Sequence, residues 1–130
     1  MNSQFKQATA FKLSDTIIAD FNGDGKVDKA VFKKEKNTSG IIIKHGGTNE
    51  EVRLCFGKPF ANMTDFDWVD FWGIVKDKET FEIVIDENSE IVDDRTISLE
   101  NPSIVVRKEE VGGGIITFKN GKYEWIHQSD

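Results

Sequence analysis

Short runs of apolar or alternating residues, separated by turn-forming residues, constrain the fold of this chain more than any other feature. Most runs are four to seven residues long, and clusters of Gly, Asn, Asp or Lys lie between them. Runs of this length with such boundaries are typical of β-strands. No window keeps a helical period for more than about two turns, which is short for a helix. The predicted strands are 16–21, 29–34, 40–44, 51–56, 71–76, 81–86, 96–99, 104–107, 115–119 and 123–127.

The turn signals complete the prediction of an all-β fold. Asn120-Gly121 separates the last two runs and is the strongest hairpin signal, because a type I′ turn needs positive φ at both central residues. The segment 61–71 is the best place for a short helix or an irregular loop, since Asn62 or Thr64 could cap a helix there. We therefore expect an antiparallel meander of about eight to ten short strands, forming a sandwich, a barrel or propeller-like sheets.

Size and charge limit the class of protein. The 130 residues are expected to form one domain, in which residues 1–10 are a disordered segment or a residual linker. Hydrophobic residues make up 38% and charged residues 31%, as in an ordinary globular protein. The net charge of -6, with no basic stripe, argues against nucleic-acid binding. We expect a monomer.

One nine-residue stretch, Asp-Phe-Asn-Gly-Asp-Gly-Lys-Val-Asp, has a spacing that indicates a particular chemistry. A hard cation such as Ca²⁺ prefers several oxygen ligands at about 2.3–2.6 Å, supplied from alternate positions of a tight loop. The stretch offers such oxygens from the side chains of Asp20, Asn22, Asp24 and Asp28 and from the carbonyl of Lys26. The sequence therefore predicts a calcium loop with these five ligands.

The same stretch has a simpler interpretation as a polar hairpin turn, because Asn-Gly and Asp-Gly are common turn dipeptides. However, three acids at this strict spacing repel one another unless a cation lies between them. The many protein oxygens favour Ca²⁺ over Mg²⁺. Since the protein supplies all five predicted ligands, we expect the ion to have a structural role rather than a catalytic one.

The loop resembles the FG-GAP or VCBS-type repeats of integrin-like β-propellers. Their motif, Asp-x-Asp/Asn-x-Asp-Gly-x-x-Asp, joins two strands around a Ca²⁺, and the resemblance covers residues 20–32. An EF-hand fits less well, because Val31 occupies the twelfth position, where an EF-hand places a bidentate Glu. The motif occurs once, so this chain cannot form a propeller from such repeats.

The resemblance also carries expectations about the site and its location. It implies that Val27, between two ligands, turns into the core and ties the metal site to the fold. The whole chain is similar to small exported bacterial proteins that contain one such loop, which implies a location outside the cytoplasm. The ligands implied by the resemblance are the side chains of Asp20, Asn22, Asp24 and Asp28 and the carbonyl of Lys26.

A second candidate region is the aromatic-rich segment 56–72, which either packs in the core or forms a binding surface. Packing is the usual role of such residues, and Trp68 is the one that we expect to be exposed. Asp65, Asp67 and Asp70 are the acids that a carbohydrate-active hydrolase would use here. Nothing in the sequence fixes their separation, so a solvated acidic loop is the preferred interpretation.

Other catalytic patterns are missing from the sequence. His45 and His127 are too few for a catalytic zinc site unless acids complete it, and no Gly-x-Ser-x-Gly motif occurs. Cys55 lies in an apolar run without the electropositive neighbours of a nucleophile. The glycines 112–114 precede a strand rather than a helix, which indicates close backbone packing or a bulge instead of a phosphate loop. We therefore expect no enzymatic activity.

Together these features predict a non-enzymatic, calcium-binding β-domain of the bacterial cell envelope that binds a protein or a glycan. The amino terminus has no apolar run, and hence no signal peptide or membrane span. Either the protein is cytoplasmic, or this is a mature form with an added methionine. Low cytosolic calcium favours the second interpretation. The alternatives are a hydrolase that uses acids of segment 65–70 and an inhibitor or immunity-type partner of a secreted toxin.

Overall fold

The computed structural model describes residues 8–35, 38–60, 63–85, 87–88, 90–108 and 112–128, with the backbone alone for 83–85 and 91–94. These residues contain eleven strands in three antiparallel sheets and no helix. The predicted all-β class is confirmed, with slightly more strands than expected. Residues 63–70 form an irregular loop rather than a helix, and Asn62 lies outside the described residues.

The four-stranded sheet is a simple meander. Its strands follow one another in the chain and in space, and each pairs with the next. Residues of alternate parity face the core: Ile17 and Ala19 are buried while Ile18, between them, is exposed. The strands are β2 (Ile17–Ala19), β3 (Asp28–Lys34), β4 (Ser39–Lys44) and β5 (Glu51–Cys55).

The five-stranded sheet departs from a meander, because its order is β1-β6-β9-β10-β11. Only its last three strands follow one another in the chain. The predicted hairpin is confirmed: Lys119 pairs with Lys122, and Asn120 and Gly121 between them have φ values of 56° and 82°. The strands are β1 (Ala8–Phe11), β6 (Phe71–Val75), β9 (Ser103–Lys108), β10 (Gly112–Lys119) and β11 (Lys122–His127).

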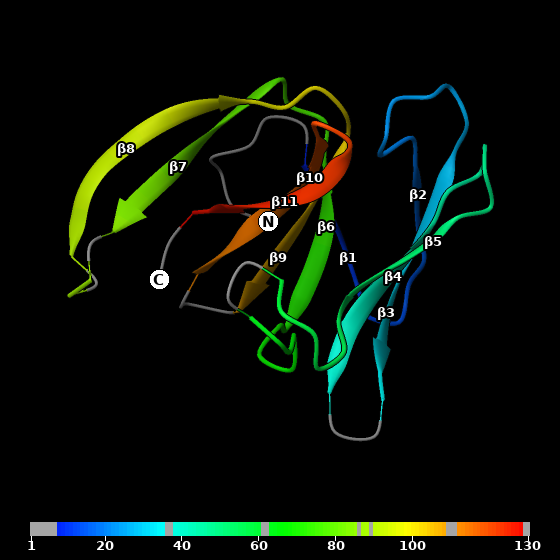
Figure 1. Cartoon of the computed structure of the whole chain (residues 1–130), viewed down its shortest axis with the longest axis horizontal. Helices are drawn as coiled ribbons and strands as arrows, with labels where there is room; N and C mark the ends of the chain where they lie inside the picture. Colours follow the sequence, from blue (N-terminus) through cyan, green and yellow to red (C-terminus); the bar gives the residue numbers. More distant parts are fainter. Residues whose placement is uncertain are drawn as a thin grey trace.

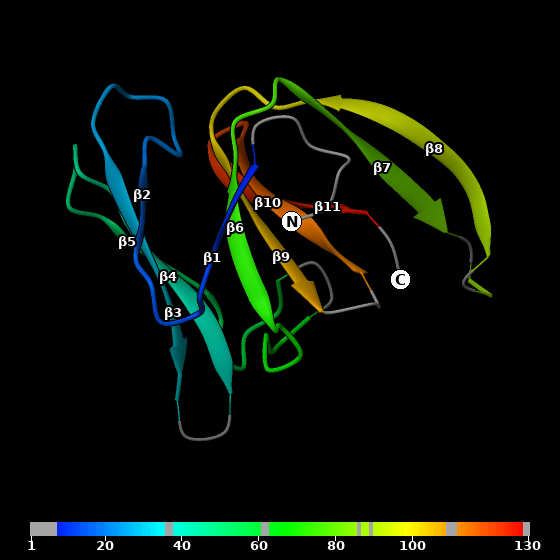
Figure 2. The same cartoon turned by 180° about the vertical axis from the view of Figure 1, so that it is seen from behind.

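A third sheet, the hairpin of β7 (Glu79–Ile85) and β8 (Ile91–Ser98), arches beside the five-stranded sheet. Both views place the five-stranded sheet between this hairpin and the four-stranded sheet (Figure 1, Figure 2). The molecule therefore has three layers and two apolar clusters. The smaller cluster belongs to the hairpin side and includes Val105, Ile115 and Ile126. No strand order closes on itself, so the sheets do not form a barrel.

The larger apolar cluster joins the four-stranded and five-stranded sheets. It includes most aromatic side chains of segment 56–72. Phe66 and Trp72 are fully buried in it, and Trp72 donates its Nε1–H to the carbonyl of Lys12 at 2.8 Å. Trp68, which we expected to be exposed, is half-buried because its ring packs edge-on against Phe66 and Trp125. The aromatic residues of segment 56–72 are thus buried or half-buried, whereas several polar residues between them are exposed.

The glycines 112–114 begin β10 itself, and two of them pack closely against neighbouring strands, which was one of the alternatives expected for them. A side chain on Gly113 would overlap the carbonyl oxygen of Val106 on β9. A side chain on Gly114 would overlap the ring of Trp125 on β11. These two contacts explain why the strand needs glycine where it passes between its neighbours.

Candidate metal centre

The predicted calcium loop joins β2 to β3 and lies at one end of the four-stranded sheet. In Figure 1 the turn between β4 and β5 projects from the same end. Gly23 and Gly25 have φ values of 73° and 88°, a left-handed conformation that glycine adopts without strain. The two glycines therefore let residues 20–27 fold back within a short span.

Side-chain oxygens inside the loop accept hydrogen bonds from the loop's own backbone. Asp20 accepts at both oxygens, from the backbone N–H of Asp24 at 3.2 Å and of Gly25 at 2.9 Å. Asp24 Oδ1 in turn accepts from the N–H of Lys26 at 2.8 Å. These bonds fold the carboxylates of Asp20 and Asp24 back onto the backbone of the loop.

Asp28, the first residue of β3, is fully buried and acts as the anchor of the loop. Its Oδ2 accepts from the backbone N–H of Phe21 at 2.9 Å and of Asn22 at 3.4 Å. Its Oδ1 accepts from the N–H of Gly46, in the β4–β5 turn, at 2.9 Å. A carboxylate has about four acceptor positions, so roughly one is left for a cation.

Three further residues lie at this end of the molecule: His45, Glu50 and Tyr123. The sequence did not connect them with the loop. His45 is buried at the start of the β4–β5 turn, with Nδ1 3.4 Å from Asn22 Nδ2 and 3.7 Å from Glu50 Oε1. On its other side, Nε2 lies 2.6 Å from the hydroxyl of Tyr123 on β11. His45 thus links the loop to the five-stranded sheet.

The phenol of Tyr123 reports the charge around it. Its pKa is raised above the ordinary value, first by burial and then by the carboxylates of Asp28, Glu50, Asp20 and Asp24, in that order. Four carboxylates therefore act on one half-buried phenol. This concentration of negative charge is the electrostatic property expected of a cation site.

The donor chemistry fits Ca²⁺, although the side chains do not yet converge. Carboxylate, amide and carbonyl oxygens are the ligands that this ion prefers. Across the part of the chain that the structure describes, no group of three or more His, Cys, Asp or Glu side chains is arranged to hold a metal. The reason at this loop is visible in the hydrogen bonds, since Asp20, Asp24 and Asp28 point at backbone amides. The five-ligand set accordingly remains a prediction.

One expectation about the loop is wrong: Val27 does not turn into the core. Its side chain is 61% exposed, and nearby Ile18 is 56% exposed. Successive side chains of an extended strand point to opposite faces, so the burial of Asp28 turns Val27 outward. Asp28, rather than Val27, ties the loop to the interior.

The acids of segment 65–70 have other roles. Asp65 Oδ1 accepts from the backbone N–H of Ser39 at 2.7 Å and of Asp67 at 2.9 Å. The exposed Asp67 carboxylate lies 3.7 Å from Lys34 Nζ. These contacts shape a loop and provide no support for a pair of catalytic carboxylates.

Cys55 is a buried thiol whose pKa is raised to about 11 by burial and then by Asp65, which makes it a poor nucleophile. Two further acidic pairs of the sequence, Asp93-Asp94 and Glu109-Glu110, have no described side chains.

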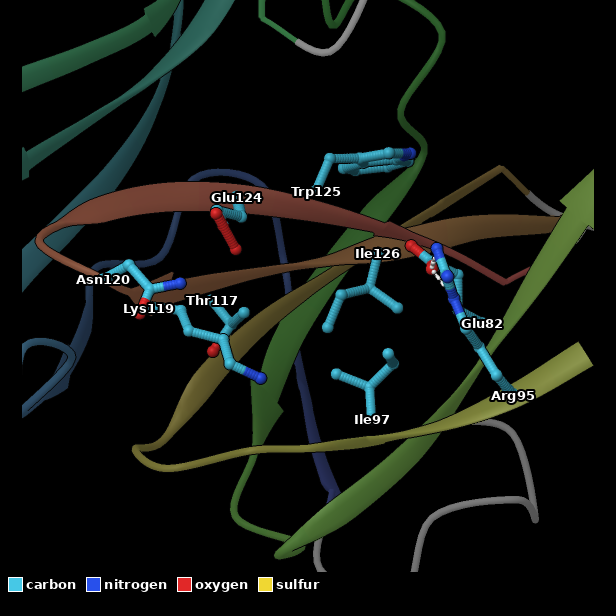
Figure 3. A pocket seen from close by; sticks show the side chains of 9 residues that line it. All are labelled: Glu82, Arg95, Ile97, Thr117, Lys119, Asn120, Glu124, Trp125 and Ile126. Atoms are coloured by element: carbon cyan, nitrogen blue, oxygen red, sulfur yellow. Dashed lines mark hydrogen bonds and ion pairs between the residues drawn. The ribbon is translucent and has the colours of Figure 1, made fainter.

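A cavity of about 240 Å³, which the sequence did not predict, lies between the β7–β8 hairpin and the β10–β11 pair (Figure 3). Figure 3 shows Ile97 and Ile126 in its interior, with Trp125 on the opposite side of β11 from Ile126. At one end, Arg95 Nε donates to Glu82 Oε1 at 2.7 Å. The charges at that end neutralise each other, while Lys119, Asn120 and Glu124 line the other end (Figure 3).

Comparison of the chain with protein-family models, with curated proteins and with solved structures finds no match. In the described residues, no helix is long and apolar enough to cross a membrane.

Proposed function

We propose that residues 20–28 bind one Ca²⁺ in a structural role. The ligands in this proposal are the side-chain oxygens of Asp20, Asn22, Asp24 and Asp28 and the carbonyl oxygen of Lys26. A bound ion offsets the mutual repulsion of the acids and stabilises the junction of β2, β3 and the β4–β5 turn. At a hundredfold excess over its dissociation constant, it adds about 2.7 kcal/mol to the free energy of unfolding.

The observation that carries the proposal is the spacing of the acids in a compact loop, which turns at Gly23 and Gly25 and folds back on itself through backbone hydrogen bonds. Asp20 accepts from the N–H of Asp24 and Gly25, and Asp24 accepts from the N–H of Lys26. A plain two-residue hairpin turn needs none of these bonds. The pKa of Tyr123, raised by burial and then by four carboxylates, is consistent with a concentration of negative charge at this end of the molecule.

The wider role we propose is that of a non-enzymatic, extracytoplasmic domain that binds a protein or glycan of the bacterial cell envelope. A single loop of ordinary affinity fills where calcium is abundant, as it is outside the cytosol. Beside the loop, the exposed side chains of Ile18 and Val27 offer apolar contact to a partner. Two observations support a role without catalysis: Asp65 accepts a hydrogen bond from the backbone of Ser39, and burial raises the pKa of the Cys55 thiol.

Isothermal titration calorimetry of the chelator-stripped protein with CaCl₂ tests the calcium site. We expect one binding event per chain, strongly weakened but still measurable in Asp24→Ala and unchanged in Asp67→Ala. Asp67 is a matched control, because it is an exposed acid near Lys34 at the far end of β3 from the loop. No heat from the wild type, or full binding by Asp24→Ala, would refute the proposal.

The binding role is tested on the exposed apolar pair. Envelope extracts, separated into protein and glycan fractions, are captured on immobilised protein in calcium and in chelator. We expect the double variant Ile18→Ser/Val27→Ser to bind calcium normally and to lose the captured component. Equal capture by this variant and by the wild type would exclude the pair as the contact surface.

A further inference from the structure

The β4–β5 turn, residues 45–50, packs against the predicted calcium loop, residues 20–28. We infer that Gly47 in this turn is a positioning residue, which sets where the carboxylate of Asp24 lies and so tunes the affinity for the ion. This inference rests on the proposed calcium site, and it extends that site to a segment outside the motif.

The two glycines of the turn are required by close approach and not by backbone conformation. Neither Gly46 nor Gly47 has a positive φ, so an L side chain is compatible with both backbones. A Cβ on Gly46 would overlap the carbonyl oxygen of Val27. A Cβ on Gly47 would lie 2.5 Å from Asp24 Oδ2 and 3.4 Å from Lys26 Cγ. Both glycines therefore face the loop itself.

The contacts of Gly46 and Gly47 differ in which atoms would have to move if a side chain were added. At Gly46 the neighbour is backbone, and the Gly46 N–H also holds Asp28 Oδ1 at 2.9 Å. At Gly47 the neighbour is the end of the Asp24 side chain, which rotates at little cost. An alanine at position 47 consequently displaces a proposed ligand oxygen and leaves the loop backbone in place.

The turn itself is held firmly, so it does not retreat from the loop. The backbone N–H of His45 donates to the carbonyl of Glu50 at 2.8 Å, and that of Asn49 donates to the carbonyl of His45 at 2.9 Å. The ring of His45 is buried and lies within hydrogen-bond distance of Tyr123 on the other sheet. Because the turn is anchored on both sides, Asp24 is the group that moves.

Calcium affinity, measured by competition with a fluorescent chelator, tests the inference. We expect Gly47→Ala to weaken binding by about tenfold or more, the loss usual when a supporting contact of a metal ligand is removed. Its melting temperature in chelator should stay close to that of the wild type.

Gly121→Ala is the matched control. Gly121 has a φ of 82° and open space around it, so this variant lowers the melting temperature and leaves the calcium affinity unchanged.

A double-mutant cycle shows whether Gly47 acts through Asp24. In an Asp24→Ala background the added methyl group meets no carboxylate, so Gly47→Ala should cause no further loss of affinity. An additional loss in the double variant would overturn the inference, as would wild-type affinity in Gly47→Ala alone. If Gly47→Ala fails to fold, the double variant should fold, because the collision is gone; failure of both would also refute it. A wild-type protein without calcium affinity would instead refute the calcium site.

Discussion

Two short acidic segments of this protein, the loop 20–28 and the segment 65–70, use their aspartates in different ways. In the loop, every aspartate accepts hydrogen bonds from nearby backbone amides, and the three lie at one end of a sheet. In the second segment, Asp65 accepts from two amides while Asp67 is exposed, 3.7 Å from Lys34. Backbone amides thus hold all three aspartates of the loop, whereas the second segment has one held aspartate and one exposed aspartate beside a lysine.

The two segments also differ in how their carboxylates affect the pKa of a neighbouring side chain. Burial and four carboxylates raise the pKa of Tyr123 beside the loop, whereas burial and Asp65 alone raise that of Cys55 beside the segment. Gly23 and Gly25, with positive φ, let the loop that carries the acids turn back on itself. Spacing together with turn glycines, rather than the number of acids, distinguishes a candidate cation site from an acidic loop.

The largest expected effect comes from Asp28→Ala. Three backbone amides lose their acceptor at a buried carboxylate. At about 1–3 kcal/mol for each unsatisfied donor, the free energy of unfolding in chelator should fall by about 3 kcal/mol or more. Asp65→Ala, which frees two amides rather than three at a carboxylate that is only half-buried, should cost about half as much or less. Urea denaturation compares the two variants, and equal losses would contradict the contrast between the segments.

Asp20→Asn should remove the stabilisation by calcium. In the wild type this gain is about 2.7 kcal/mol at a hundredfold excess of calcium over the dissociation constant. Asp67→Asn, in the second segment, should keep the full gain. Urea denaturation with and without calcium measures both, and a variant of Asp20 that still responds fully would remove it from the ligand set.

Alkaline pH should destabilise the protein through Tyr123. The folded state holds the phenol proton more tightly than the unfolded chain, so the contribution is complete below the ordinary tyrosine pKa of about 10. Above that pH the unfolded chain ionises first, and stability falls by up to about 1.4 kcal/mol per pH unit.

Tyr123→Phe should flatten this part of the pH profile. The comparison belongs in a Cys55→Ala background, because the raised pKa of Cys55, about 11, makes stability fall from about pH 9 upward in the same sense. An unchanged alkaline slope in Tyr123→Phe would contradict the electrostatic description of the loop.

The smallest effect concerns the reactivity of Cys55. With a pKa near 11 instead of 9.0, the thiol holds about a hundredfold less thiolate at pH 8 than an ordinary cysteine. Alkylation by iodoacetamide should be slow by at least that factor. Asp65→Asn should accelerate it modestly and Asp20→Asn should not, since only Asp65 acts on this thiol. Acceleration by both variants would show that the two segments are not independent.

Local sequence patterns predicted the strands well and their assembly poorly. Each expected run overlaps an observed strand, because alternation and turn residues are local signals. The strand β1, within residues expected to be disordered or a linker, was missed: its four residues carry little apolar pattern of their own. Its pairing with β6, and that of β6 with β9, joins distant parts of the chain. No local pattern encodes such pairings.

The residues of the candidate site likewise fall into those that the local sequence identified and those that only the folded structure brings close. The spacing of residues 20–28 identified the acids that the structure gathers in the loop. His45 and Gly47 come from another turn and Tyr123 from another sheet, so their proximity depends on tertiary packing. The error at Val27 came from assigning a face by analogy, where the buried Asp28 fixes the opposite one.

A thermal melt of the chelator-stripped protein, titrated with Ca²⁺ and separately with Mg²⁺, tests the central claim most directly. Our account predicts a melting temperature that rises with Ca²⁺ and much less with Mg²⁺, because the loop offers many protein oxygens. A melting temperature that stays flat with both ions would contradict it and would reduce residues 20–28 to an acidic turn anchored by Asp28.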